Sequence, residues 1–272
     1  MSLASIARTA LCETRLGDAL RLIGAERLYR AYALRRRNPG SLQAGVFASL
    51  AAAKAAIPAG RREGWDHEET SEYWLERDLP DQSAGYPIYF WLREVLRPGD
   101  AVVDWGGSIG ITYWNYKRRT PLPDGLSWTV VEVPAIAAQG VRYAGAKGWR
   151  DLHFVSELEP ITRADVFITA GAIQYMDSSI PGLFDRLKVR PKHILINKLP
   201  LTTRPDYWTL QNLGLAVMPY RVFNDRAFIA YFESNGYRLR ERWTITDIPC
   251  RIPFYSRYFV PVKAGLYFER TD

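Results

Sequence analysis

One stretch decides the fold: Val102-Val103-Asp104-Trp105-Gly106-Gly107-Ser108-Ile109-Gly110, a short apolar run that ends in an acid and continues into a glycine-rich turn. Residues 101–103 have the pattern of a buried parallel strand, and the apolar and aromatic residues from Ile111 onward predict the start of a helix. The glycines therefore lie where a strand becomes a helix, which is where α/β proteins hold nucleotides. Glycine there permits positive φ and close approach of a ligand, and the free N–H groups of the first helical turn attract electron-rich atoms.

The segments on both sides of this turn alternate between strand and helix patterns, as a doubly wound sheet requires. Further strands are predicted over 128–133, 152–155, 165–170, 193–197, 237–243 and 265–269. Helices are predicted over 86–96, 135–143, 180–187 and 224–232, and the stretch 248–261 is predicted to form a hairpin or a covering loop. This alternation predicts an α/β fold with a Rossmann-like, mostly parallel sheet and helices on both faces.

The residues before this alternation predict a helical extension. Apolar residues recur at near-helical spacing through the first run of three arginines, although Gly17 and Gly24 weaken the pattern, and a second helix is predicted over 49–56. We therefore divide the chain into a helical N-terminal extension, residues 1–64, and a ligand-binding domain, residues 65–272.

The extension is predicted to act as a lid or as a subunit contact, which implies a homodimer. Its first helix is basic and amphipathic and ends in Arg35-Arg36-Arg37. A peripheral contact with a membrane surface is therefore the alternative.

The composition is that of an ordinary globular protein with a basic surface. The 272 residues are 47% hydrophobic and carry a net charge of +7. The clusters of arginine and lysine are short and lie outside any nucleic-acid motif, so we expect solvated faces and no nucleic-acid partner. No apolar run predicts a membrane span, and residues 3–11 are too short and too interrupted by Arg8 for a convincing signal peptide, so we expect a cytoplasmic protein.

Cysteine and histidine give no sign of a metal site. Cys12 and Cys250 are far apart and predict neither a disulfide framework nor metal-ligand spacing. His67 is flanked by acids but has no partners at fixed spacing, so a loop or helix cap is the better interpretation. His153 and His193 each begin a predicted strand; His153 is interpreted as structural, and His193 is a weaker candidate for a general base. We expect no metal.

Asp104 discriminates between the nucleotides that such a turn can hold, whereas an acid at the position of Glu132 suits both a dinucleotide and S-adenosylmethionine. A dinucleotide site has glycines in the order G-x-G-x-x-G and must accept a pyrophosphate, which a carboxylate directly before the turn would repel. The same carboxylate suits a ligand with an ammonium and a sulfonium group, and S-adenosylmethionine is that ligand. Glu132 ends the next predicted strand, where an acid accepts hydrogen bonds from ribose hydroxyls. The alternative for Asp104 is a helix N-cap or a buried, hydrogen-bonding acid.

Five motifs, in order along residues 65–243, carry a likeness to a known family. They are Asp104-Trp105-Gly106-Gly107-Ser108-Ile109-Gly110 with Tyr113, Trp128-Thr129-Val130-Val131-Glu132-Val133-Pro134, Gly171-Ala172-Ile173-Gln174-Tyr175, Asn197-Lys198-Leu199-Pro200 and Gln211-Asn212. In these motifs the sequence resembles the class I S-adenosylmethionine-dependent methyltransferases, and more narrowly the methyltransferase family described as the LIC12133 type, which is associated with surface-polysaccharide gene neighbourhoods. The resemblance implies S-adenosylmethionine as cofactor, an antiparallel last strand and a place in polysaccharide biosynthesis.

The resemblance also implies roles for individual residues. The cofactor-binding residues it implies are Asp104, Gly106, Gly107, Ser108, Gly110, Glu132, Gly171 and Ala172, with Ser156 or Glu157 beside the adenine. Ser108 departs from the wider superfamily, which has glycine there; serine is the least disruptive replacement, and its hydroxyl can donate a hydrogen bond. The implied catalytic residues are Gln174, Tyr175 and Asp177. Tyr175 and Asp177 are candidates for the general base that a hydroxyl acceptor requires.

The acceptor is predicted to be a sugar or another small polar metabolite that is methylated on oxygen. The predicted substrate-binding residues are Lys198, Trp208, Gln211 and Asn212. Polar and aromatic groups after the fifth strand suit a sugar ring, and the alternative for this group is a capped helix packed on the sheet edge. Two other functions stay open, a nicotinamide-dependent oxidoreductase and a catalytically silent scaffold that keeps the methyltransferase fold.

Overall fold

The computed structural model describes residues 9–37, 41–67, 69 and 83–271. The chain forms two compact units, each assembled from three segments. Unit 1 contains Met1–Trp65, Pro200–Ala227 and Thr246–Lys263, and unit 2 contains Asp66–Leu199, Phe228–Ile245 and Ala264–Asp272. The glycine-rich turn belongs to unit 2.

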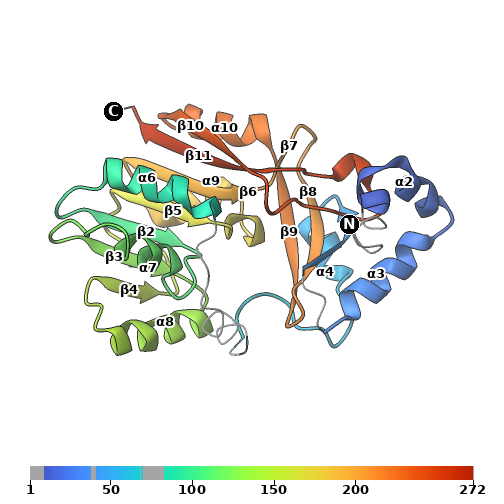
Figure 1. The fold of residues 1–272 in the computed structure, drawn as a ribbon, viewed down its shortest axis with the longest axis horizontal. Helices are drawn as coiled ribbons and strands as arrows, with labels where there is room; N and C mark the ends of the chain where they lie inside the picture. Colours follow the sequence, from blue (N-terminus) through green and yellow to red (C-terminus); the bar gives the residue numbers. More distant parts are fainter. Residues whose placement is uncertain (1–8, 38–40, 68, 70–82, 272) are drawn as a thin grey trace. The chain divides into compact units, whose positions relative to one another are not determined.

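Unit 2 is built on a seven-stranded sheet with the order β10-β11-β6-β5-β2-β3-β4 (Figure 1). The strands are β2 (Ala101–Trp105), β3 (Ser127–Val131), β4 (Leu152–Val155), β5 (Val166–Ala170), β6 (His193–Leu199), β10 (Tyr237–Ile245) and β11 (Lys263–Arg270). β4, β3, β2, β5 and β6 run parallel, whereas β11 runs antiparallel to β6. The mostly parallel sheet with an antiparallel last strand is therefore confirmed.

Helices cover both faces of this sheet. They are α6 (Tyr86–Val95), α7 (Ile111–Lys117), α8 (Pro134–Lys147), α9 (Ile180–Leu187) and α10 (Asp225–Ser234). Val166 and Ile168 of β5 lie in one apolar cluster with residues of α6 and α7. Phe167, between them in the strand, packs against Phe184 of α9 instead, because successive side chains of a strand point to opposite faces. The predicted α/β layering is confirmed.

Unit 1 contains a second sheet of four strands with the order β1-β8-β9-β7. The strands are β1 (Leu42–Phe47), β7 (Leu201–Thr202), β8 (Tyr207–Asn212) and β9 (Val217–Asn224), and the helices are α2 (Arg15–Leu22), α3 (Ala25–Arg35) and α4 (Leu50–Ala55). β1 and β9 both pair antiparallel with β8. Buried residues of α3, α4, β1, β8 and β9 form one apolar cluster, Ala33, Leu34, Ala44, Ala53, Trp208, Leu210 and Val217.

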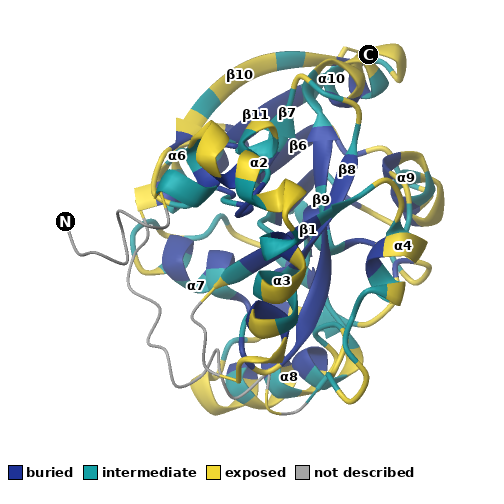
Figure 2. Cartoon of the chain, turned by 90° about the vertical axis from the view of Figure 1, so that its right-hand side faces the viewer, coloured by how far each residue is buried: buried dark blue, intermediate teal, exposed yellow. Residues whose placement is uncertain are grey.

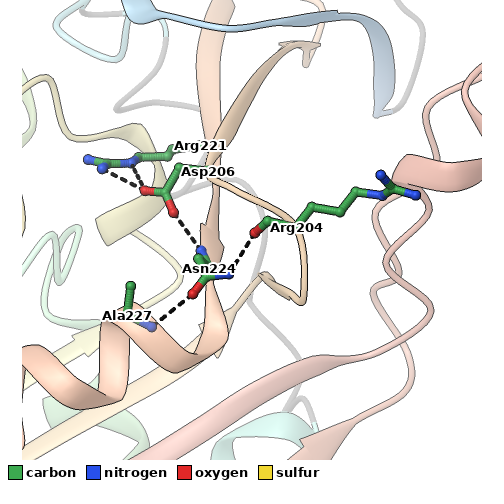
Figure 3. A network of polar contacts seen from close by, with 5 residues as sticks. All are labelled: Arg204, Asp206, Arg221, Asn224 and Ala227. Carbon is green, nitrogen blue, oxygen red and sulfur yellow. Dashed lines mark hydrogen bonds and ion pairs between the residues drawn. The ribbon is translucent and has the colours of Figure 1, made fainter.

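A polar network fixes the end of β9 and the start of α10 (Figure 3). Asp206 accepts hydrogen bonds from Arg221, at 3.0 Å from Nε and 2.7 Å from Nη2, and from the backbone N–H of Asn224 at 2.6 Å. Asn224 donates to the carbonyl of Arg204 at 2.8 Å and accepts from the N–H of Ala227 at 2.8 Å, which caps the helix. The predicted helix start at residue 224 therefore has a capping side chain.

Unit 1 departs from the sequence prediction. β1 lies in the segment for which only helices were predicted, and β8 and β9 lie where no strand was predicted. The predicted first helix is two helices, because Gly24 takes a φ of +85° between α2 and α3. Leu42 pairs with Asn212, so residues 200–227 join the N-terminal residues in one unit instead of the α/β unit. Pairing over such a sequence distance leaves no local pattern to detect.

Candidate functional site

The glycine-rich turn joins β2 to α7 at the carboxyl end of the parallel strands. The N–H of Gly106 donates to the carbonyl of Val131 in β3 at 2.8 Å, and Gly106 and Gly110 have φ of +69° and +87°. A Cβ on Gly106 would lie 2.1 Å from the Cβ of Ala172, and a Cβ on Gly110 would lie 2.8 Å from Leu152 Cδ2. Both positions therefore need glycine, for backbone conformation and for space.

Asp104 lies directly beneath this turn. Its side chain is fully buried, and a Cβ on Gly107 would lie 2.5 Å from its Cγ. Oδ2 accepts a hydrogen bond from Trp128 Nε1 at 3.3 Å, and the side chain of Thr112 also hydrogen-bonds to the carboxylate. Burial raises the pKa of Asp104 to about 7, opposed by the hydrogen bonds from Trp128 and Thr112 and reinforced by the charge of Glu132. Asp104 thus has the buried, hydrogen-bonded position that was the sequence alternative, at the place where the turn begins.

Glu132 directly follows β3 and holds the turn from the side. Its Oε1 accepts a hydrogen bond from the backbone N–H of Ser108 at 3.3 Å, and its Oε2 accepts one from the N–H of Val133 at 2.8 Å. A carboxylate oxygen has two lone-pair directions, so each oxygen has room for another donor, such as a ribose hydroxyl. Burial raises the pKa of Glu132 to about 7, against these two hydrogen bonds.

Ser108 has a φ of +56°, in the left-handed region. A glycine is favoured at such a position because a side chain there costs about 1–2 kcal/mol. The Ser108 side chain is buried, and its Oγ has no hydrogen-bond partner within the described part of the chain. The turn therefore contains a serine with a left-handed backbone and a buried hydroxyl that has no hydrogen-bond partner among the described residues.

A second loop adjoins the turn through the contact of Ala172. Gly171 follows β5 with a φ of +85° and donates its N–H to the carbonyl of Asn197 at 3.0 Å. Gln174 Nε2 donates to the carbonyl of Gly171 at 2.7 Å, and Gln174 Oε1 is buried without a partner among the residues described. The stem of Lys198 crosses Gly171, where a Cβ would lie 3.3 Å from Lys198 Cδ, and burial lowers the pKa of Lys198.

The remaining predicted residues of unit 2 are more exposed. Tyr175 ends the short helix η2 (Ile173–Tyr175) and is half-buried, and Asp177 is exposed. Ser156 and Glu157 follow β4 and are exposed, and Glu157 Oε2 forms an ion pair with Arg186 Nη2 at 2.7 Å. The structure therefore brings Gln174 beside the turn and leaves Asp177 at the surface.

The predicted substrate-binding residues are divided between the units. Lys198 belongs to unit 2, whereas Trp208, Gln211 and Asn212 lie on β8 of unit 1, on a strand and not on a capped helix. The amide of Asn212 is buried and hydrogen-bonds to Ala33, Arg36, Arg61 and Gly214. Trp208 is in the apolar cluster, and Gln211 Nε2 donates to Ser41 Oγ at 2.9 Å. Asn212 therefore holds unit 1 together, and we assign no acceptor contact to it.

His193, Cys12 and Cys250 are buried within the fold. His193 is buried with Nδ1 2.9 Å from the hydroxyl of Tyr267, and burial lowers its pKa. Cys12 and Cys250 are buried and are not joined in a disulfide. Within residues 9–37, 41–67, 69 and 83–271, no three or more His, Cys, Asp or Glu side chains are grouped so that they can hold a metal ion.

Two neighbours of the acids were not predicted from the sequence. The register of β2 and β3 pairs Asp104 with Val130, so the side chain of Trp128, two residues earlier, points to the same face as that of Val130. Asp66 accepts a hydrogen bond from the first turn of α8 at 2.9 Å, and its charge contributes to the raised pKa of Glu132. Strand alternation supplies a signal for Trp128, but Asp66 lies in a stretch that predicts only a loop.

Comparison with known proteins gives similarity at the level of the fold. No protein-family model matches the chain, and no curated protein matches it. A methyltransferase in complex with the Trm112 methyltransferase activator of Haloferax volcanii has a TM-score of 0.51 at 12% identity, over 75% of this chain and 96% of that one. Magnesium protoporphyrin IX methyltransferase from Synechocystis, solved with bound S-adenosylmethionine, has a TM-score of 0.50 at 11% identity, over 76% and 94%.

A third solved structure has a TM-score close to those of these two. An S-adenosylmethionine-dependent methyltransferase from Clostridium acetobutylicum has a TM-score of 0.50 at 8% identity, over 75% of this chain and 97% of that one. The sheet order, with β11 antiparallel beside β6, agrees with the family resemblance of the sequence. The chain contains the Rossmann-like fold of class I S-adenosylmethionine-dependent methyltransferases.

Proposed function

We propose that the protein is an S-adenosylmethionine-dependent methyltransferase whose cofactor binds at the turn between β2 and α7. One observation carries the proposal: Glu132 holds the N–H of Ser108 at the mouth of a turn that begins over the buried Asp104. An acid under the turn and an acid beside it suit a cationic, ribose-bearing ligand. Solved structures of this fold include one with bound S-adenosylmethionine, which supports the same cofactor here.

The described residues fit this cofactor. Gly106 and Gly110 have no side chain to obstruct it, and Glu132 has lone pairs for the ribose hydroxyls. Ser108 Oγ is a buried oxygen without a hydrogen-bond partner among the described residues, and a polar ligand bound at the turn can supply that partner. When bound, the cofactor supplies an electrophilic methyl group. Gly171 and Ala172 complete the proposed site from the adjoining loop.

The acceptor side is proposed to include Lys198, Gln174 and Tyr175. Lys198 and Gln174 flank Gly171, whose loop contacts the turn through Ala172. The acceptor is a hydroxyl of a sugar or another small polar metabolite. These side chains would orient it, and Tyr175 or the exposed Asp177 would take its proton. Trp208 and Gln211 lie on β8 of unit 1, and we assign them no part in this site.

The two other functions make different predictions for Asp104 and for turnover. A nicotinamide-dependent enzyme must accept a pyrophosphate at the turn, and the buried acid beneath Gly107 disfavours this. A catalytically silent scaffold would bind the cofactor or a partner without transferring a methyl group. A place in polysaccharide biosynthesis, membership of the LIC12133-type family, a cytoplasmic location and a homodimer are further parts of the proposal.

Calorimetric titration with S-adenosylhomocysteine and, separately, with NAD⁺ tests the cofactor. We expect a dissociation constant in the micromolar range for S-adenosylhomocysteine and no heat with NAD⁺. Transfer of a labelled methyl group to a panel of sugars then tests turnover. Binding of NAD⁺ alone would establish the oxidoreductase, and cofactor binding without transfer to any acceptor would favour the scaffold.

A further inference from the structure

Unit 1 has an exposed apolar face on α2 and α3, made of Leu16, Leu22, Ile23, Leu28 and Tyr32. Leu22, Ile23 and Leu28 are 83%, 79% and 77% exposed. Leu16 and Leu22 belong to α2 and Ile23 directly follows it, while Leu28 and Tyr32, four residues apart, lie along one side of α3. Figure 2 shows exposed turns on both helices. Several large apolar side chains with this exposure on two helices that contact each other are typical of a binding surface.

Arginines accompany this apolar face. Arg15, Arg27, Arg35 and Arg37 are exposed. Arg36 is exposed as well, and its guanidinium lies over the ring of Tyr32, 5.4 Å from the ring centroid. Long arginine stems can cover apolar surface while their charged ends reach anionic groups. The face is therefore apolar with a positive border.

The acids of the same segment are engaged within unit 1. Glu13 Oε1 accepts a hydrogen bond from Arg251 Nε at 2.6 Å, and Asp18 accepts two from Ser256, from its N–H at 3.2 Å and its hydroxyl at 2.6 Å. Glu26 is buried, with Oε1 3.3 Å from Arg30 Nη1. The acids of residues 9–37 are thus bound by their own unit, while most of the arginines are at the surface.

We propose that this face of α2 and α3 binds an anionic lipid surface, with arginines on the lipid phosphates and the apolar side chains in the acyl boundary. Basic residues near such a surface each strengthen binding about fivefold, and the apolar side chains leave water at the same time. A nucleic acid would use the arginines but leave Leu22, Ile23 and Leu28 in water. A second copy would bring two positive faces together. Within the residues that the structure describes, no helix is long and apolar enough to span a membrane.

Sedimentation of the full chain with vesicles tests the proposal. We expect binding to phosphatidylcholine vesicles that contain about one-third phosphatidylserine, little binding to phosphatidylcholine alone, and release by high salt. Leu22→Ser with Ile23→Ser should weaken binding about tenfold or more, and a variant with Arg35, Arg36 and Arg37 changed to glutamine should weaken it by about a hundredfold. Val141→Ser, a change of an exposed apolar residue on α8, is the matched control and should bind as the original chain does.

Each variant is first checked for an unchanged thermal unfolding midpoint, which these exposed positions predict. Equal binding to neutral and anionic vesicles, or no binding to either, would overturn the proposal. So would a dimer that the Leu22→Ser and Ile23→Ser changes dissociate, or tighter binding to single-stranded RNA than to the anionic vesicles. Because these measurements use no S-adenosylmethionine, failure here is distinguishable from failure of the proposed methyltransferase activity.

Discussion

Replacing Asp104 by asparagine is expected to stabilise the protein at neutral and alkaline pH. The carboxyl group is fully buried, and burial raises its pKa from 3.8 to about 7. A tenfold change in a protonation equilibrium corresponds to about 1.4 kcal/mol, so this rise corresponds to about 4 kcal/mol of cost for the ionised form. Asparagine can keep the acceptor for Trp128 Nε1 and carries no charge to bury.

The sign of the pH dependence follows from the raised pKa of Asp104. Between about pH 4 and pH 7 the folded protein holds a proton that the unfolded chain has released, so the free energy of unfolding falls as pH rises through this range. Glu132 contributes in the same direction, because its pKa is also raised to about 7. The Asp104→Asn variant loses the first contribution and keeps the second. Its advantage over the original chain should therefore grow from near zero at pH 4 to a maximum, at most about 4 kcal/mol, above pH 7.

Urea unfolding of both proteins between pH 4.5 and pH 8.5 measures this difference. In the same variant, the affinity for S-adenosylmethionine should fall about tenfold, because the negative charge beneath the turn is gone. If Asp104→Asn is less stable than the original chain at pH 8, or if the difference in their free energies of unfolding does not change with pH, the buried charge of Asp104 does not have the expected cost. Unchanged cofactor affinity would instead limit Asp104 to a structural role.

Three further substitutions, with Gly145→Ala as a control, test the turn and the adjoining loop. Ser108→Gly should raise the free energy of unfolding by about 1 kcal/mol in urea titrations, since it removes left-handed strain and an unpartnered buried hydroxyl, and destabilisation would count against this. Gly106→Ala should destabilise by more than about 2 kcal/mol, because its Cβ meets that of Ala172, whereas Gly145→Ala, with open space in α8, should stabilise; similar effects at both would contradict the geometry. Lys198, which is proposed to orient the acceptor, should be needed for fast methyl transfer: Lys198→Met should slow the transfer without changing cofactor affinity, and an unchanged rate would contradict this role.

The α/β unit was predictable because its strands are short apolar runs that end in acids, glycines or prolines. The strand at 152–155 and the helix at 180–187 have the predicted bounds, and the other predicted strands of this unit are present with small changes at their ends. In such a sheet each strand and the helix after it are close in sequence, so local periodicity contains most of the information.

Unit 1 was not predictable in the same way. β1 contains Gly45 with a φ of +79°, and its partner β8 is supplied by the second half of the chain. In β8, Tyr207, Trp208, Thr209 and Leu210 are all buried, so the alternation that marks a half-buried strand is absent. A short strand without alternation and without a local partner resembles a loop in the sequence.

The sequence patterns predicted where the glycine-rich turn, Asp104 and Glu132 lie along the chain, but they did not predict which residues contact the two acids. The apolar run before Asp104 and the strand before Glu132 were enough to place both near the glycines. The burial of Asp104 depends on the register of β2 against β3. The hydrogen bond from the backbone N–H of Ser108 to Glu132 Oε1 depends on the left-handed backbone at Ser108. Both are consequences of three-dimensional packing, so a local sequence pattern does not contain them.

The most direct test of cofactor binding beside Glu132 is the dissociation constant of S-adenosylhomocysteine, measured by calorimetry for the original chain and for Glu132→Gln. Glu159→Gln, which changes an exposed acid of the same unit, is the control. We expect the original chain and the control to bind S-adenosylhomocysteine with micromolar dissociation constants. Glu132→Gln should bind it about tenfold to hundredfold more weakly, because a charged acceptor for the ribose hydroxyls is lost. No binding by the original chain, or equal affinity in all three proteins, would contradict cofactor binding beside Glu132.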